Sequence, residues 1–430
     1  MTSTIIISFC ILLLIAYLFD LTSSKTKIPS VILLLLLGWL LHQLTVFLNI
    51  HLPSFTSTLP VLGSIGLILI VLEGSLELDL NRSKIGLIRK SFLGSLISMF
   101  VLTFLLSLLF QYLGGFPFRT CLANAIPFSV ISSAIAIPSV RGITSVNKEF
   151  VIYESSLSDI FGVIFFNFII LNNDYGFRTF GSFSLQLIII VVISFFATIG
   201  LTILLRKIEH HIKFIPIILL VILIYALLDH YKLPSLIFIL IFGLFIGNIY
   251  KFKTFKWIKK LHPEELKIED QKFKEITTEV AFLVRALFFI LFGYVLKTSE
   301  ILNTHSLLLS VGVVMIIFGF RILQLKLSRL PLKPLLFVAP RGLITILLFL
   351  SIVPTQHLTL VNKSLIVQVI ILTAFIMMFG LMAFPAKEEY EEEEVALVVK
   401  SLPLSVKRQV VHSYLLKRIF VRIKTGRVTD

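Results

Sequence analysis

The chain is built from long apolar stretches separated by short polar connections. Thirteen stretches are long enough to cross a bilayer, because a hydrocarbon core about 30 Å thick takes about 20 helical residues. The predicted spans are residues 4–19, 28–47, 58–72, 91–112, 120–140, 150–171, 185–205, 214–228, 233–249, 276–296, 307–325, 335–353 and 364–384. We therefore predict an all-α polytopic membrane protein, with about 13 transmembrane helices in a domain over residues 1–384 and a tail over residues 385–430.

Basic residues gather in every second connection between the predicted spans. Of the 39 Lys and Arg residues, 31 lie in the segments that follow the odd-numbered spans. Basic residues in short loops resist translocation and collect on the cytoplasmic side of a membrane. The pattern predicts an N-terminus outside and a C-terminal tail inside. We expect the plasma (inner) membrane as the location.

The formal net charge of +15 does not indicate a nucleic-acid partner, because these cations are spread over the cytoplasmic rims of the bundle. The lipid bilayer is the expected partner. The first apolar stretch lacks a basic n-region and a small-residue cleavage site, so we interpret it as a retained helix. Cys10 and Cys121 stand in different spans and support neither a disulfide framework nor a metal site. No cofactor is expected.

Two segments outside the predicted spans have an amphipathic pattern. Residues 250–275 mix eight Lys with aromatic and apolar residues, which predicts a short helix lying in the membrane interface. The aromatic and apolar residues of this segment that we single out are Phe252, Phe255, Trp257 and Ile258. The tail, residues 385–430, begins with an acidic run and ends with a basic segment that has apolar residues at helical spacing. We favour a tail lying on the membrane surface over a regulatory partner site, although the pattern itself does not separate them.

Six side chains that are charged at pH 7 (Asp, Glu or Arg) lie inside the predicted spans. They are Glu154, Asp159, Glu279, Arg285, Arg321 and Arg341. A charge in hydrocarbon costs several kcal/mol, so such residues are usually paired, face a wet cavity or carry out a function. At about 1.5 Å of rise per residue, Glu154 and Arg321 lie about one turn from the cytoplasmic side. By the same estimate, Asp159, Arg285 and Arg341 lie near the midplane.

The matching depth of Glu154 and Arg321 predicts either a buried salt bridge between two helices or an ion-binding site, and we favour the salt bridge. For Asp159 we favour function, because a carboxylate at mid-depth can bind a cation or a proton, one at a time. Ser155 lies four residues earlier on the same helical face and could offer its hydroxyl oxygen to the same cation.

Two predicted spans are interrupted. In the fifth, Ser132 and Ser133 lie between Pro127 and Pro138, and serine side chains can satisfy or coordinate backbone groups that the prolines free. The twelfth has a second interruption at residues 339–342. The two spans enter from opposite sides, as inverted repeats with two broken helices crossing at the midplane require. A simple kink remains the alternative for each proline taken singly.

Four segments resemble, in the same order, motifs of the monovalent cation:proton antiporter superfamily, the sodium/proton exchangers. Residues 66–79 are similar to that family's Gly-Leu-Glu-Leu-Asp-like signature. Residues 153–162 resemble its Glu-Ser-x-x-Asn-Asp-Gly motif. Residues 288–293 resemble its Phe-rich helix, and residues 340–343 resemble its Arg-Gly motif.

The resemblance implies a core domain that moves against a dimerisation domain, in a homodimer, and carries one ion between the two faces of the membrane. It implies that Asp159 is the shared cation and proton site and that Ser155 coordinates the cation. It also implies that Glu154 and Arg321 form a structural pair. No step in this scheme needs a cofactor.

Several positions depart from the family's pattern. Ser132 and Ser133 stand where exchangers often carry a Thr-Asp pair, which removes a second carboxylate and leaves hydroxyls and backbone carbonyls as ligands. Ser158 stands where relatives carry Asn or, in those that move net charge, Asp. A single carboxylate favours electroneutral exchange. Arg285 stands near a position that is acidic in some relatives. The candidates for tuning the site are Arg285, Arg341 and Ser158, with helix packing as the alternative for Arg285.

From these residues we expect a secondary transporter that exchanges a monovalent cation, Na+ ahead of K+, for H+ by alternating access. A K+/H+ antiporter and a channel-like or sensory relative are the alternatives. An enzyme is not expected, because the chain has neither a His-Glu-x-x-His run nor a Gly-x-Ser-x-Gly nucleophile motif.

Overall fold

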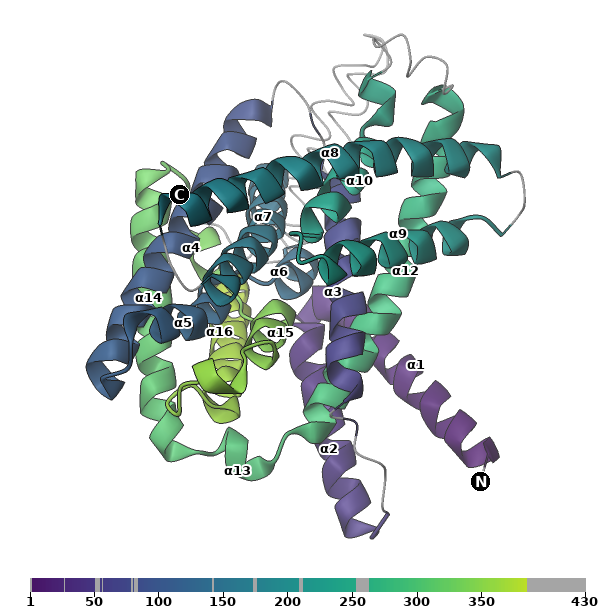
Figure 1. The fold of residues 1–430 in the computed structure, drawn as a ribbon. Helices are drawn as coiled ribbons and strands as arrows, with labels where there is room; N and C mark the ends of the chain where they lie inside the picture. Colours follow the sequence, from purple (N-terminus) through teal and green to yellow (C-terminus); the bar gives the residue numbers. More distant parts are fainter. Residues whose placement is uncertain are drawn as a thin grey trace, which may run out of the picture.

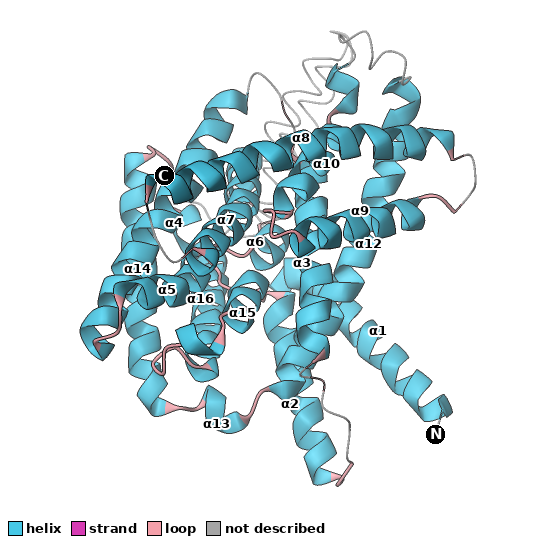
Figure 2. Ribbon diagram, viewed as in Figure 1, coloured by secondary structure: helices cyan, strands magenta, loops and turns pink. Residues whose placement is uncertain are grey.

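The computed structural model describes residues 2–384, except for 27, 51–54, 56, 79, 81–83, 141–142, 173–175, 209–211 and 253–262. This part of the chain is helical, and no strand occurs among the residues described (Figure 2). The predicted all-α class is confirmed. The tail, residues 385–430, lies outside the described residues, so its two interpretations stay predictions.

Every predicted span coincides with helical structure (Figure 1). The first half contains α1 (Thr2–Thr26), α2 (Ser30–Phe47), α3 (Thr58–Glu77), α4 (Ile85–Gly114), α5 (Phe118–Ser129), α6 (Ser133–Ser139) and α7 (Ser145–Leu171). The second half contains α8 (Phe177–Lys207), α9 (Phe214–His230), α10 (Leu236–Gly247), η2 (Ile249–Phe252), α12 (Pro263–Val295), α13 (Thr298–Ile301), α14 (Thr304–Leu327), η3 (Leu335–Phe337), α15 (Leu343–Leu350), η4 (Pro354–Gln356) and α16 (Lys363–Ala383).

The helices have the lengths and apolar composition expected of a polytopic membrane protein. Ten helical segments among the described residues are long and apolar enough to cross a membrane, with α5 and α6 counted as one, and α9 and α10 are shorter apolar helices. The remaining predicted span, residues 335–353, is divided into η3 and α15. Together they correspond to the thirteen predicted spans.

The connection predicted at residues 250–275 differs from the structure. α12 begins at Pro263, so the second half of this segment is the start of a 33-residue helix. The physical reason is local, because residues 264–275 contain no Gly or Pro and are rich in Glu and Lys, which favour a helix that continues into the span. Phe255, Trp257 and Ile258 lie outside the described residues.

The helices pack in two groups (Figure 1). In the core group, α4, α5, α6 and α7 pack with α14, η3, α15 and α16. In the outer group, α2, α3, α8, α10 and α12 pack on one another, with α1 and α9 beside them. α3 also contacts α6, α7 and α15 of the core group, so it lies at the interface between the two groups.

Glycines bring α3 close to the core group at two levels. A Cβ at Gly63 would collide with the Leu347 side chain on α15. A Cβ at Gly74 would lie 2.9 Å from the Ser156 hydroxyl oxygen on α7. Small residues allow helix backbones to approach closely, and this close packing drives helix association in membranes.

Two broken helices cross inside the core group. Residues 130–132 separate α5 from α6, and residues 338–342 separate η3 from α15. The Ser132 N–H donates to the Pro340 carbonyl at 2.9 Å, so the two non-helical segments touch through their backbones. A Cβ at Gly342 would lie 2.7 Å from the Ser132 hydroxyl oxygen, so this approach needs a glycine. The predicted crossing of two broken helices is confirmed.

Candidate functional site

Asp159 lies in the middle of α7 and is only 1% exposed. The Ser133 hydroxyl, on the first residue of α6, donates a hydrogen bond to Asp159 Oδ2. Asp159 Oδ1 is buried and has no hydrogen-bond partner among the described residues. Because a buried carboxylate oxygen without a donor is energetically costly, this oxygen favours binding of a proton or a cation.

Ser155 and Ser132 are buried next to this pair along the chain. The Ser155 hydroxyl donates to the Val151 carbonyl at 2.8 Å, which leaves its oxygen lone pairs available to a cation. Ser132 is held at the crossing through its backbone. The structure thus brings Ser133 into direct contact with Asp159. Within the described part of the chain, neither Ser155 nor Ser132 hydrogen-bonds to Asp159.

Glu154 and Arg321 form a buried ion pair between α7 and α14. Arg321 Nη1 lies 2.5 Å from Glu154 Oε1, and Arg321 Nη2 lies 2.8 Å from Glu154 Oε2. Arg321 also donates to the carbonyls of Leu335 and Val338, at 3.3 Å each. The guanidinium therefore neutralises Glu154 and satisfies carbonyls beside the break between η3 and α15.

Arg341 and Ser158 hold the broken segments in place. Arg341 Nε donates to the Phe128 carbonyl near the end of α5 at 2.5 Å, and Arg341 Nη1 donates to the Ala339 carbonyl at 2.9 Å. Ser158 Oγ accepts from the Ile131 N–H at 3.0 Å. Backbone groups freed by a helix break in a membrane must find such partners. Among the described residues, neither side chain hydrogen-bonds to Asp159.

A buried acid beside two crossed broken helices agrees with the comparison of the chain with family models. The model described as "Sodium/hydrogen exchanger, transmembrane" matches residues 10–388. The chain belongs to the sodium/hydrogen exchanger family. It is therefore an integral membrane protein of a transporter family that couples monovalent cations to protons.

The exchanger is also similar to two solved structures of the sodium proton antiporter MjNhaP1 from Methanocaldococcus jannaschii. One, at pH 8, is 20% identical over 89% of this chain and 96% of that chain, with a TM-score of 0.61. The other, from electron microscopy, is 18% identical with the same coverage and a TM-score of 0.64. At these identities the likeness shows the fold. A search of curated proteins finds no match to the exchanger.

Arg285 makes no hydrogen bond or ion pair with the predicted site residues in the described part of the chain. It is buried on α12 in the outer group, and its neighbour Val284 lies 3.6 Å from the position of a Cβ at Gly66 on α3. The described residues contain no ion pair between Arg285 and Asp159, so the structure does not bring these two predicted residues together.

Gln324 and Glu73 are among the polar residues of the bundle that were not identified from the sequence. Gln324 Nε2 donates to Glu154 Oε1 at 2.6 Å, and Gln324 Oε1 accepts from Arg321 at 2.9 Å. Its spacing of three residues from Arg321 on one helix was the available signal. Glu73 lies within α3, because that helix continues to Glu77 whereas the predicted span ends at residue 72.

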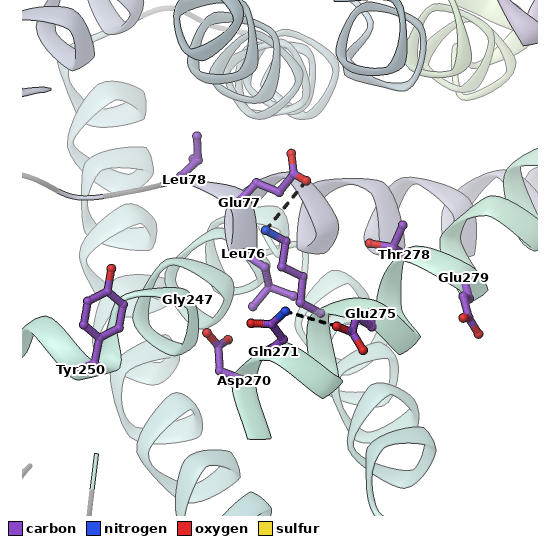
Figure 3. A pocket seen from close by; sticks show the side chains of 11 residues that line it. Leu76, Glu77, Leu78, Gly247, Tyr250, Asp270, Gln271, Glu275, Thr278 and Glu279 are labelled. Carbon is purple, nitrogen blue, oxygen red and sulfur yellow. Dashed lines mark hydrogen bonds and ion pairs between the residues drawn. The ribbon is translucent and has the colours of Figure 1, made fainter. Parts of the chain in front are cut away.

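A cavity of about 620 Å3 opens between the end of α3, the end of α10 and the first turns of α12 (Figure 3). Its charged lining residues are Glu77, Asp270, Lys274, Glu275 and Glu279. Lys274 Nζ lies 3.8 Å from Glu77 Oε1, which leaves an excess of acidic groups at the wall. Glu279, predicted inside the bilayer, is an exposed residue of this cavity.

Proposed function

We propose that the exchanger transports a monovalent cation, with Na+ preferred, against H+ at Asp159. The observation that carries this proposal is the buried carboxylate with one oxygen bonded to Ser133 and the other without a donor among the described residues. A proton on the open oxygen removes the buried charge, and a bound cation neutralises it. Because the proton and the cation each compensate the same buried carboxylate charge, each displaces the other.

The expected ligands are oxygens that lie close to Asp159. Ser133 contacts the carboxylate, Ser155 keeps oxygen lone pairs available, and Ser132 belongs to the opened backbone between α5 and α6. A hard monovalent cation prefers carboxylate, hydroxyl and carbonyl oxygens, and water can complete its shell. Carboxylate and hydroxyl oxygens also accept K+, so a K+/H+ antiporter is the second candidate.

One-for-one exchange follows from the count of titrating acids. Glu154 is held by both terminal nitrogens of Arg321, so it stays a structural carboxylate rather than a second site. Asp159 alone then alternates between one proton and one cation. Each cycle moves no net charge, and Arg341 remains in its role at the helix crossing.

Alternating access would come from movement of the core group against the outer group. Asp159 is almost fully buried, and α3 contacts the core group at Gly63 and at Gly74, on two levels of the membrane. Opening one contact at a time would expose the site to one side. We place the N-terminus outside and the tail inside a plasma (inner) membrane, from the Lys and Arg distribution, and propose a homodimer formed through the outer group.

The test is exchange by purified protein in vesicles that contain a pH-sensitive dye. Addition of Na+, and more weakly K+, should change the internal pH with wild type and not with Asp159→Asn. Asp229→Asn on α9, in the outer group, is the matched control and should retain exchange. Clamping the membrane potential should leave the rate unchanged. Exchange retained by Asp159→Asn contradicts the site, and cation flux without proton movement indicates a channel.

A further inference from the structure

The hydroxyl of Ser156 has surroundings unlike those of most other serines in the bundle. Ser156 is 2% exposed, and its Oγ has no hydrogen-bond partner among the described residues. Buried serines in helices commonly donate to the carbonyl one turn earlier, as Ser155 does to Val151 and Ser107 does to Thr103. A buried hydroxyl that lacks this bond carries a desolvation cost, which a passing ligand can offset.

Ser156 lies where three helices meet. A Cβ built on Gly74 of α3 would lie 2.9 Å from Ser156 Oγ on α7 and 3.8 Å from Ile137 Cδ1 on α6. Because Gly74 has no side chain, the hydroxyl occupies the space between α3 and α7. The junction of Gly74, Ile137 and Ser156 therefore joins the outer group to the core group.

This junction is one helical turn from the proposed ion site. Ser156 precedes Asp159 by three residues on α7, and Ile137 follows Ser133 by four residues on α6. Residues at these spacings lie on the same side of a helix, and helical side chains lean toward the N-terminus, so Asp159 leans toward Ser156. Along α6 and α7, Asp159 and Ser133 lie at one level, and Ser156 and Ile137 of the junction lie about one turn away.

The acid-lined cavity lies beyond the junction along α3. Glu77 and Leu78, which line it, follow Gly74 by three and four residues. α3 thus passes from the junction to the cavity within about one turn. In the proposed orientation this end of α3 is cytoplasmic, so the junction stands between Asp159 and the cytoplasmic cavity.

We propose that Ser156 is a cation-coordinating gate residue on the cytoplasmic side of Asp159. This inference rests on the proposed exchange at Asp159 and adds a ligand to it. When α7 separates from α3 at Gly74, the Ser156 oxygen is a protein ligand that a partly dehydrated cation meets between the acid-lined cavity and the carboxylate. A proton needs no such ligand, because it can pass along water molecules. Ser156 therefore acts on cation entry from one side.

The experiment measures the apparent KM for Na+ on each face, with everted and right-side-out vesicles, at fixed pH. Ser156→Ala should raise the cytoplasmic KM by about three- to tenfold, the effect of one lost neutral ligand, and leave the opposite KM unchanged. Ser107→Ala, which removes a buried hydroxyl on α4, is the matched control and should alter neither value. An unchanged cytoplasmic KM, or an equal rise on both faces, overturns the gate.

A second variant tests the contact itself. Gly74→Ala should slow turnover, because its Cβ would lie 2.9 Å from Ser156 Oγ, and adding Ser156→Ala to this variant should restore much of the rate. No restoration contradicts the proposed contact.

A third measurement does not depend on transport. Ser156→Cys, with exposed Cys10 changed to Ser, should react with a membrane-impermeant thiol reagent from the cytoplasmic face only, and Na+ should protect it. Labelling from the opposite face, or labelling that Na+ does not reduce, overturns the inference. Failure of the exchange proposal shows separately, as transport retained by Asp159→Asn.

Discussion

Glu154 and Asp159 are two buried acids on one helix with opposite surroundings. Glu154 accepts hydrogen bonds from Arg321 on both oxygens and a further one from Gln324. Asp159 accepts one from the Ser133 hydroxyl, and its second oxygen has no donor within the described residues. Burial alone therefore does not distinguish a structural acid from an exchanging one. The number and charge of the fixed donors do, because a carboxylate with donors on both oxygens and a guanidinium as counter-charge gains little from an added ion.

The largest effect expected is the loss of exchange in Asp159→Asn. An amide lacks the negative charge for which the cation and the proton compete, so transport should fall below detection. The free energy of unfolding should not decrease, because the change removes a buried charge that lacks a full set of partners. Vesicle exchange and thermal unfolding in detergent measure the two outcomes. A marked loss of stability with transport retained would reverse the assignment of the two acids.

Breaking the ion pair between Glu154 and Arg321 should instead lower the stability of the protein. Arg321→Met leaves Glu154 buried without its counter-charge and frees the carbonyls of Leu335 and Val338. We expect the free energy of unfolding to fall by about 3–5 kcal/mol. Thermal and denaturant unfolding of the purified protein measure this change.

The control for that prediction is the double variant Glu154→Leu with Arg321→Met. Removing both charges leaves no unpaired ion, so the double variant should be more stable than Arg321→Met alone. A double variant that is less stable than either single change would mean that the pair is not an isolated structural unit.

Arg341→Lys should have an intermediate effect, because it keeps the charge but replaces a planar fork of donors by one ammonium. A single ammonium cannot reproduce the bonds from Nε to Phe128 and from Nη1 to Ala339. We expect a loss of about 1–3 kcal/mol in the free energy of unfolding and slower exchange. Arg329→Lys, at an exposed residue of the connection after α14, should change neither quantity, and an equal effect there would contradict the role of the crossing.

The smallest effects are expected at the hydroxyls around Asp159. Ser133→Ala removes the donor to Oδ2 and a cation ligand, so the apparent KM for Na+ should rise about three- to tenfold. Ser155→Ala should raise it less, because that hydroxyl donates to Val151 rather than to Asp159. Initial rates of exchange over a range of Na+ concentrations measure both, and Ser133→Thr should restore the wild-type value. A larger effect at Ser155 would place the cation nearer the N-terminal turn of α7.

Much of the fold could be predicted from local patterns. Hydropathy located the helices, because a span must be apolar along its whole length. Pro127, Pro138 and Pro340 indicated the two broken helices, although residues 130–132 separate α5 from α6 between the prolines rather than at them. The beginning of α12 was missed because its first turns are polar and lie outside the apolar pattern.

The candidate site could be predicted only in part. Asp159 and the depth match of Glu154 with Arg321 follow from the rarity of charge in spans. Gln324 and Ser156 could not be found in this way, because uncharged polar residues are common in membrane helices and carry no such signal. Their roles depend on Glu154 and Gly74, which are far from them in the chain.

The sequence by itself determined that this is a helical membrane protein, which helices it has, and which few charges lie within them. Those properties depend on the solvent that each residue meets, and hydrocarbon excludes unpaired charge wherever a chain crosses it. The depth of the charges favoured Glu154 as the paired acid, and only the tertiary structure decided which donors hold each carboxylate and which oxygen stays open within the described residues. That decision depends on the side chains that packing brings within hydrogen-bonding distance, and the spacing of residues along the chain does not specify them.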